Sequence, residues 1–127
     1  MKGKRPNLVV DADAIDRIPR APSWMGKHAK AEWNRVLPAL VQRRVLTPAD
    51  LGSVENYAVA CGRVRELEAL IQKATEIDPV LFRLQDKATG TARQLASELG
   101  LTPVSRSRPS VREGAADDDG ANPLNIS

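Results

Sequence analysis

The feature that most constrains this chain is a long apolar stripe with the seven-residue repeat of a helix that packs on other helices. From Tyr57 to Ala74, apolar residues recur at alternating steps of three and four, which places them on one helical face. A second apolar line runs beside it, through Leu51, Val54, Ala58 and Cys61. Two apolar lines on one helix need two packing partners. The pattern therefore predicts an all-α fold in which this helix contacts its own chain and also neighbouring copies.

The stripe supplies the residues expected to hold copies of the chain together. The predicted oligomerisation residues are Tyr57, Ala60, Val64, Leu67 and Ile71.

Local signals predict where the long helix begins and ends. Thr47 has the chemistry of an N-cap, Pro48 suits the first helical position, and Asp50 places a carboxylate near the positive helix end. The helix is predicted to run from Pro48 to about Thr75. Its two glycines, Gly52 and Gly62, are expected to allow close approach of another helix.

A third helix is predicted directly after the long one. Asp78 is a good N-cap, Pro79 a good first residue and Gly100 a strong stop, while Gly90 predicts a kink midway. Because only a few residues join the two helices, they should form an antiparallel hairpin. Thr102 is then expected to cap one short further turn.

An earlier helix is predicted over residues 26–43. One face carries its apolar residues, which are Ala29, Trp33, Val36 and Leu40, widened by Leu37 and Val41. Pro38 lies inside this pattern, so it should bend the helix or begin a new one.

These patterns divide the chain into three parts. Residues 1–22 are predicted to be a flexible lead-in that ends where Trp24 packs against the helices. Residues 23–108 form the helical core and oligomerisation domain. Residues 109–127 are rich in proline, glycine and serine and include three consecutive aspartates, Asp117–Asp119, so they are predicted to be disordered.

Charge is distributed unevenly along the sequence. Residues 1–50 hold ten lysines and arginines against five acidic residues, whereas the remainder is slightly acidic. This basic front favours a polyanionic partner, although a solvated helix face would have the same composition. The candidate DNA-binding residues are Lys27, Lys30, Arg35, Arg43 and Arg44, with a second patch at Arg106, Arg108 and Arg112.

Little in the sequence points to catalysis, a metal or a cofactor. Cys61 is the single cysteine and is interpreted as a buried thiol, and His28, the single histidine, is expected to pair with Glu32. No phosphate-binding or dinucleotide-binding glycine motif occurs. The aspartate run is interpreted as a solvated or partner-contacting tail. No apolar run approaches a membrane span and no secretory signal is recognisable, so an intracellular protein without a membrane partner is expected.

The order of these signals resembles the phage terminase small subunit family. The similarity covers roughly residues 19–108, through the segments PSWMGKHAKAEWNRVLPAL and LTPADLGSVENYAVACGR and the ending LGLTPVSR. The matching residues are Pro22, Trp24, Met25, Ala29, Trp33, Leu46, Thr47, Asp50, Leu51, Tyr57, Leu99, Gly100, Leu101, Thr102, Pro103, Ser105 and Arg106. Many relatives carry a longer insertion between the second and third helices, which is almost absent in this chain.

The resemblance implies a non-catalytic protein of genome packaging in the host cytoplasm. Such proteins form ring-like homo-oligomers, recognise the start site on double-stranded phage DNA and regulate the large subunit, which holds the ATPase and nuclease. Two other interpretations compete with this one. A small helical transcription regulator would need a short recognition helix, and an enzyme with a site shared between subunits would need a catalytic motif.

Overall fold

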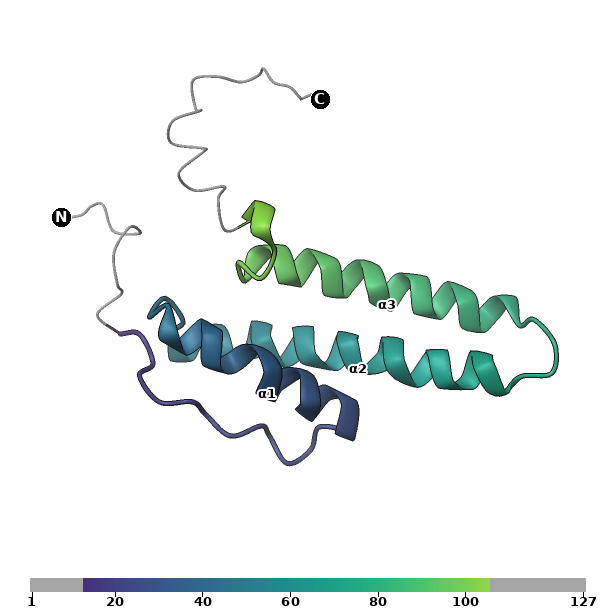
Figure 1. Ribbon diagram of the computed structural model, residues 1–127, viewed down its shortest axis with the longest axis horizontal. Coiled ribbons are helices and arrows are strands. Elements are labelled where there is room, and N and C mark those ends of the chain that lie inside the picture. Colours follow the sequence, from purple (N-terminus) through teal and green to yellow (C-terminus); the bar gives the residue numbers. More distant parts are fainter. Residues whose placement is uncertain (1–12, 106–127) are drawn as a thin grey trace, which may run out of the picture. The chain divides into compact units, whose positions relative to one another are not determined.

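A computed structural model of the chain describes residues 13–105. Within that range lie three α-helices, α1 (Lys27–Gln42), α2 (Leu51–Lys73) and α3 (Pro79–Glu98), and a 3-10 turn, η1 (Pro48–Asp50), with no strand among the described residues (Figure 1). The predicted all-α class is confirmed. One compact unit extends to Leu95 and a second begins at Ala96. The predictions for residues 109–127 and for Arg106, Arg108 and Arg112 fall outside the described residues.

The core of the first unit lies between α1 and the first half of α2. The largest fully buried side chains are Trp33, Leu37 and Leu40 from α1 and Val54 from α2. All six apolar residues predicted for the inner face of α1 are buried, as the periodicity indicated. Pro38 lies on the exposed side, and α1 continues through it as one helix. Any backbone carbonyl that loses its partner there can reach water.

One of the two glycines in α2 permits the close contact with α1. A Cβ built on Gly62 would lie 3.0 Å from the backbone nitrogen of Ala29 and 3.3 Å from its Cα. Gly62 is therefore a true crossing point of the two helices. The same prediction for Gly52 is wrong, because nothing lies within 4 Å of a Cβ built there. Gly52 itself is exposed, although Val54 in the same turn of α2 is buried in the core.

The predicted helix starts are confirmed by their hydrogen bonds. The Asp50 carboxylate accepts bonds from the Thr47 backbone N–H at 2.8 Å and from the Thr47 hydroxyl at 2.9 Å. The first turn after Thr47 is a 3-10 turn and α2 itself begins at Leu51. At α3, the Asp78 carboxylate accepts a bond from the Val80 backbone N–H at 3.0 Å. These side chains satisfy backbone donors that a helix start leaves open.

The predicted stop of α3 is also confirmed. Gly100 has a φ of 73°, the left-handed conformation that favours glycine. The Leu101 N–H donates to the Ala96 carbonyl at 2.8 Å and the Gly100 N–H to the Ser97 carbonyl at 3.1 Å, the pair of bonds that defines a Schellman motif. The expected cap at Thr102 is present too, because its hydroxyl accepts a bond from the Ser105 N–H at 3.0 Å. Earlier in α3, the helix continues through Gly90.

Helices α2 and α3 form the predicted hairpin. They lie side by side (Figure 1). The Gln85 side chain of α3 donates to the Val64 carbonyl at 3.2 Å and to the Glu68 carboxylate at 2.8 Å. Between the helices is a largely apolar groove of about 460 Å³, lined in part by Leu67, Leu70 and Leu84. Within α3, all of which the structure describes, no side chain is fully buried. The hairpin thus leaves much of its apolar surface in contact with solvent.

The segment before α1 corrects one expectation. Trp24 does not pack against the helices, because 63 % of its surface is exposed. Its neighbour Met25 is buried in its place. The described part of the predicted flexible lead-in lies along the first unit and makes hydrogen bonds with it. The Ile15 N–H donates to the Leu46 carbonyl at 2.8 Å, and the Trp33 indole donates to the Pro19 carbonyl at 2.9 Å.

Candidate nucleic-acid interface

The basic residues predicted on α1 are spread along the length of the helix and around its circumference. Lys27, Arg35 and Arg44 are exposed, and Lys30 and Arg43 are half-buried. A helix rises 1.5 Å per residue, so these cations extend over roughly 24 Å along α1. The lysines stand at its N-terminal end, the last two arginines at its C-terminal end, and Arg35 between them. Cations spread over this length suit an extended polyanion better than a small anion.

Arg44 ends α1 in a conformation that arginine rarely adopts. Its φ is 59°, in the left-handed region, and its N–H donates to the Val41 carbonyl at 2.9 Å. Glycine is the usual residue at such a position, since a Cβ there costs roughly 1–2 kcal/mol. Strain of this kind at an exposed cation directs attention to a functional use of the side chain.

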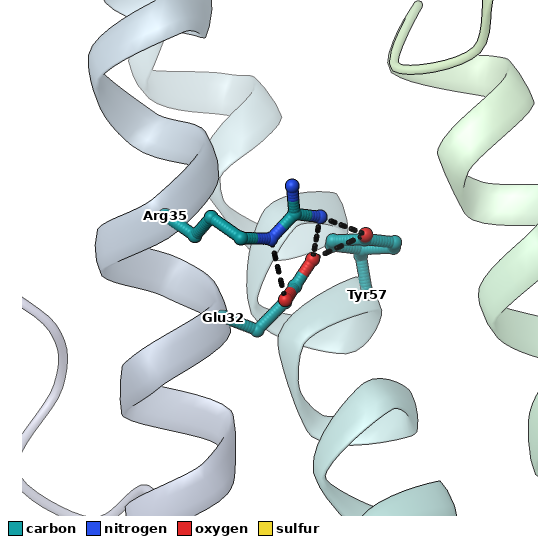
Figure 2. A network of polar contacts seen from close by, with 3 residues as sticks. All are labelled: Glu32, Arg35 and Tyr57. Carbon is teal, nitrogen blue, oxygen red and sulfur yellow. Dashed lines mark hydrogen bonds and ion pairs between the residues drawn. The ribbon is translucent and has the colours of Figure 1, made fainter.

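Arg35 is held in place by a polar network that joins α1 to α2 (Figure 2). Its Nε donates to Glu32 Oε1 at 2.9 Å, while its Nη2 donates to Glu32 Oε2 and, at 3.5 Å, to the Tyr57 hydroxyl. The Tyr57 hydroxyl also donates to Glu32 Oε2. The other terminal nitrogen of Arg35 points away from both partners in Figure 2, and 67 % of the side chain is exposed. The network therefore orients a guanidinium whose outer edge stays accessible.

The network shifts the pKa values of its members. The hydrogen bonds from Arg35 hold the pKa of Glu32 below its ordinary value of 4.5, even though burial opposes the shift. Burial and the bond to Glu32 raise the pKa of Tyr57. Burial likewise raises the pKa of the nearby Cys61 thiol, which is half-buried and not fully buried as predicted. The two shifts at Glu32 and Tyr57 favour the charged carboxylate and the neutral hydroxyl that these hydrogen bonds require.

Sequence reasoning missed one basic residue of this surface. Arg65 of α2 lines a pocket of about 120 Å³ together with His28, Glu32 and Arg35 of α1. The available signal was its place on the second apolar line of α2, four residues after Cys61, because that position lies one turn beyond the part of the line that is apolar. The expected pairing of His28 with Glu32 is replaced, since the Glu32 carboxylate accepts its bonds from Arg35 and Tyr57.

Comparison with known families decides the identity of the chain. The family model of the phage terminase small subunit matches residues 29–116. The chain belongs to the phage terminase small subunit family. The expected resemblance is therefore confirmed, and with it a role in packaging phage DNA; members of this family are generally the non-catalytic subunit. No curated protein and no solved structure matches the chain.

The residues predicted to join copies of this terminase small subunit differ in burial. Tyr57 and Ala60 are buried within the chain, where Tyr57 contacts Glu32 of α1. Val64, Leu67 and Ile71 are only half-buried, and the exposed Leu70 lies beside them. The C-terminal half of α2 thus keeps apolar surface that a neighbouring chain can cover, while α1 already covers its N-terminal half.

Neither a metal-ligand cluster nor a membrane-spanning helix occurs in the described part of this terminase small subunit. Between residues 13 and 105, no group of three or more histidine, cysteine, aspartate or glutamate side chains could hold a metal ion. In the same range, no helix is both long and apolar enough to cross a membrane. The aspartate run at Asp117–Asp119 lies outside these residues.

Proposed function

We propose that this terminase small subunit binds double-stranded phage DNA at the start site for genome packaging through the outer surface of α1. The observation that carries the proposal is the oriented Arg35, whose exposed guanidinium lies between the lysines at the start of α1 and the arginines at its end. A guanidinium fixed by Glu32 and Tyr57 loses little conformational freedom when it contacts a phosphate. Arg65 of α2 adds positive charge beside it. These contacts are to phosphates, so they supply affinity with little sequence discrimination.

The experiment measures DNA affinity across a range of salt concentrations. Lys27 and Lys30 stand at the N-terminal end of α1. The variant with alanine at both positions should weaken binding to all duplex sequences about equally. Its salt dependence should also be shallower by about one unit per lost phosphate contact. The control is a double alanine variant of Lys73 and Lys87, which removes two cations from α2 and α3. Equal losses in both variants would contradict the assignment of the surface to α1.

If the second basic patch, at Arg106 and Arg108, binds the DNA instead, alanine variants of the two patches should rank in the opposite order of DNA affinity. Both residues lie outside the described range, so the ranking must come from binding data. If alanine at Arg106 and Arg108 abolishes DNA binding while the Lys27 and Lys30 variant retains it, the second patch is the DNA-binding surface.

The proposal includes a ring-like homo-oligomer built on the α2–α3 hairpin. None of the 20 residues of α3 is fully buried within its own chain, which leaves apolar surface on this helix for another chain to cover. The half-buried residues Val64, Leu67 and Ile71 lie on the same hairpin and supply the apolar contacts. Leu67→Asp would place a carboxylate in this interface and should reduce the particle size measured by light scattering. An oligomer of unchanged size that remains folded would contradict this interface.

The same proposal assigns regulation of the large subunit to this chain in the host cytoplasm. The support is the family membership and the acidic run at Asp117–Asp119 in the C-terminal residues. Deleting residues 113–127 should leave the melting temperature and the particle size unchanged while it weakens stimulation of the large subunit's ATPase. A large fall in melting temperature would show that these residues serve the fold instead.

A further inference from the structure

Trp24 is the most exposed aromatic side chain among the described residues. Its surface is 63 % exposed, whereas Trp33 is 1 % exposed in the core. A single exposed apolar residue is ordinary on a protein surface. Trp24 differs because the chain has only four aromatic residues and the adjacent Met25 takes the buried position. Its backbone setting and its charged neighbours identify what the indole contacts.

The backbone around Trp24 is fixed on both sides. The Met25 N–H donates to the Pro22 carbonyl at 3.2 Å, which closes a turn with Trp24 inside it. Upstream, the Pro19 carbonyl accepts the bond from the Trp33 indole at 2.9 Å. The two prolines also restrict φ at their own positions. A large flat side chain presented from a fixed turn loses little entropy on binding, so its contact contributes more of its free energy to affinity.

The charge around Trp24 is of one sign. Residues 17–30 contain no acidic residue. They contain four basic residues, which are Arg17, Arg20, Lys27 and Lys30. Arg20 and Lys27, which flank the tryptophan in sequence, are both exposed, and further cations follow along α1. This charge is complementary to a long polyanion, and its length favours duplex DNA over a short acidic peptide.

We infer that Trp24 contacts duplex DNA directly, with its indole packed against the sugar edges of a groove while Arg20 and Lys27 bind the phosphates on either side. The inference rests on the proposed DNA binding and extends that surface from α1 onto the turn before it. An apolar contact releases no counterions. Trp24 therefore adds affinity that is independent of salt, in contrast to the lysines of α1.

The test uses the full-length protein and a duplex oligonucleotide, and it follows two readouts. Quenching of tryptophan emission by acrylamide reports on Trp24, because Trp33 is already buried; bound duplex should protect the accessible fraction. Trp24→Ala should weaken duplex binding about tenfold, the loss expected when one aromatic side chain no longer buries its apolar surface, while the salt slope stays unchanged. Trp24→Phe should retain most of the affinity, because it keeps a flat apolar ring. Its remaining emission, from Trp33, should not respond to DNA.

Each other outcome overturns the inference in a distinguishable way. If the wild-type protein binds duplex DNA but Trp24 stays accessible and Trp24→Ala binds equally well, the Trp24 contact is wrong and DNA binding stands. If the wild-type protein does not bind duplex DNA, the proposed function itself fails. If Trp24 is already protected in the free protein, a second copy covers it. Protection by the large subunit and not by DNA would make it a protein-binding residue.

Discussion

Replacing Gly62 by alanine tests whether the helix crossing of α1 and α2 sets the stability of the core. The added Cβ would lie 3.0 Å from the Ala29 backbone nitrogen and 3.3 Å from the Ala29 Cα and Cβ. Ordinary van der Waals contacts lie between 3.4 and 4 Å. The closest atom belongs to the backbone, so no side-chain rotation can relieve the clash and the helices must move apart.

Two opposing effects set the change in the free energy of unfolding for Gly62→Ala. Alanine in a helix interior is about 1 kcal/mol more favourable than glycine. Overpacking a close contact costs about 1–3 kcal/mol. The net expectation for Gly62→Ala is therefore a loss of about 1 kcal/mol in the free energy of unfolding. Gly52→Ala is the matched control on the same helix, because nothing lies within 4 Å of its Cβ. It gains the helix preference without the clash and should be stabilised by up to about 1 kcal/mol.

The assay is urea unfolding followed by circular dichroism, at one protein concentration for all variants because the oligomer contributes to stability. Both variants gain the same helix preference of alanine over glycine. The difference between their free energies of unfolding therefore isolates the cost of the close contact at Gly62, about 1–3 kcal/mol. The reasoning is refuted if Gly62→Ala unfolds at the same urea concentration as Gly52→Ala, or at a higher one.

Three further changes address the polar network and the end of α1. Tyr57→Phe removes one hydrogen bond to the Glu32 carboxylate and should cost about 1 kcal/mol in urea unfolding. Because Arg35 lowers the pKa of Glu32 in the folded state, this pair stabilises the protein above pH 4.5, and its contribution is lost as the pH falls through the folded pKa. Glu32→Gln removes this titration, so its free energy of unfolding should fall less steeply in acid than that of the wild type. A pH profile of stability parallel to the wild type would contradict this. Arg44→Gly should raise stability by about 1 kcal/mol, since glycine accepts a φ of 59°, while it weakens duplex DNA binding; loss of both stability and binding would show that Arg44 serves the fold.

Local sequence signals were enough to predict the helix ends and the inner face of α1. The Thr47–Asp50 cap and the stop at Gly100 form between residues three to five positions apart, so the information for each lies in a few neighbouring residues. The apolar face of α1 follows from the helical repeat in the same way, because side chains at steps of three and four must share a face. The family also followed from the order of these local signals along the chain.

Three features could not be predicted without the three-dimensional structure. They are the apolar residue before α1 that is buried, the glycine at the helix crossing and the arginine that is held in place. Trp24 and Met25 are adjacent and both apolar, and the direction of one turn places Met25 inside. Gly62 lies against Ala29 while Gly52 faces open space. Arg35 is oriented through Tyr57, which is 22 residues away along the chain. Each of these outcomes depends on where a second segment lies in space, and local periodicity carries no information about that distance.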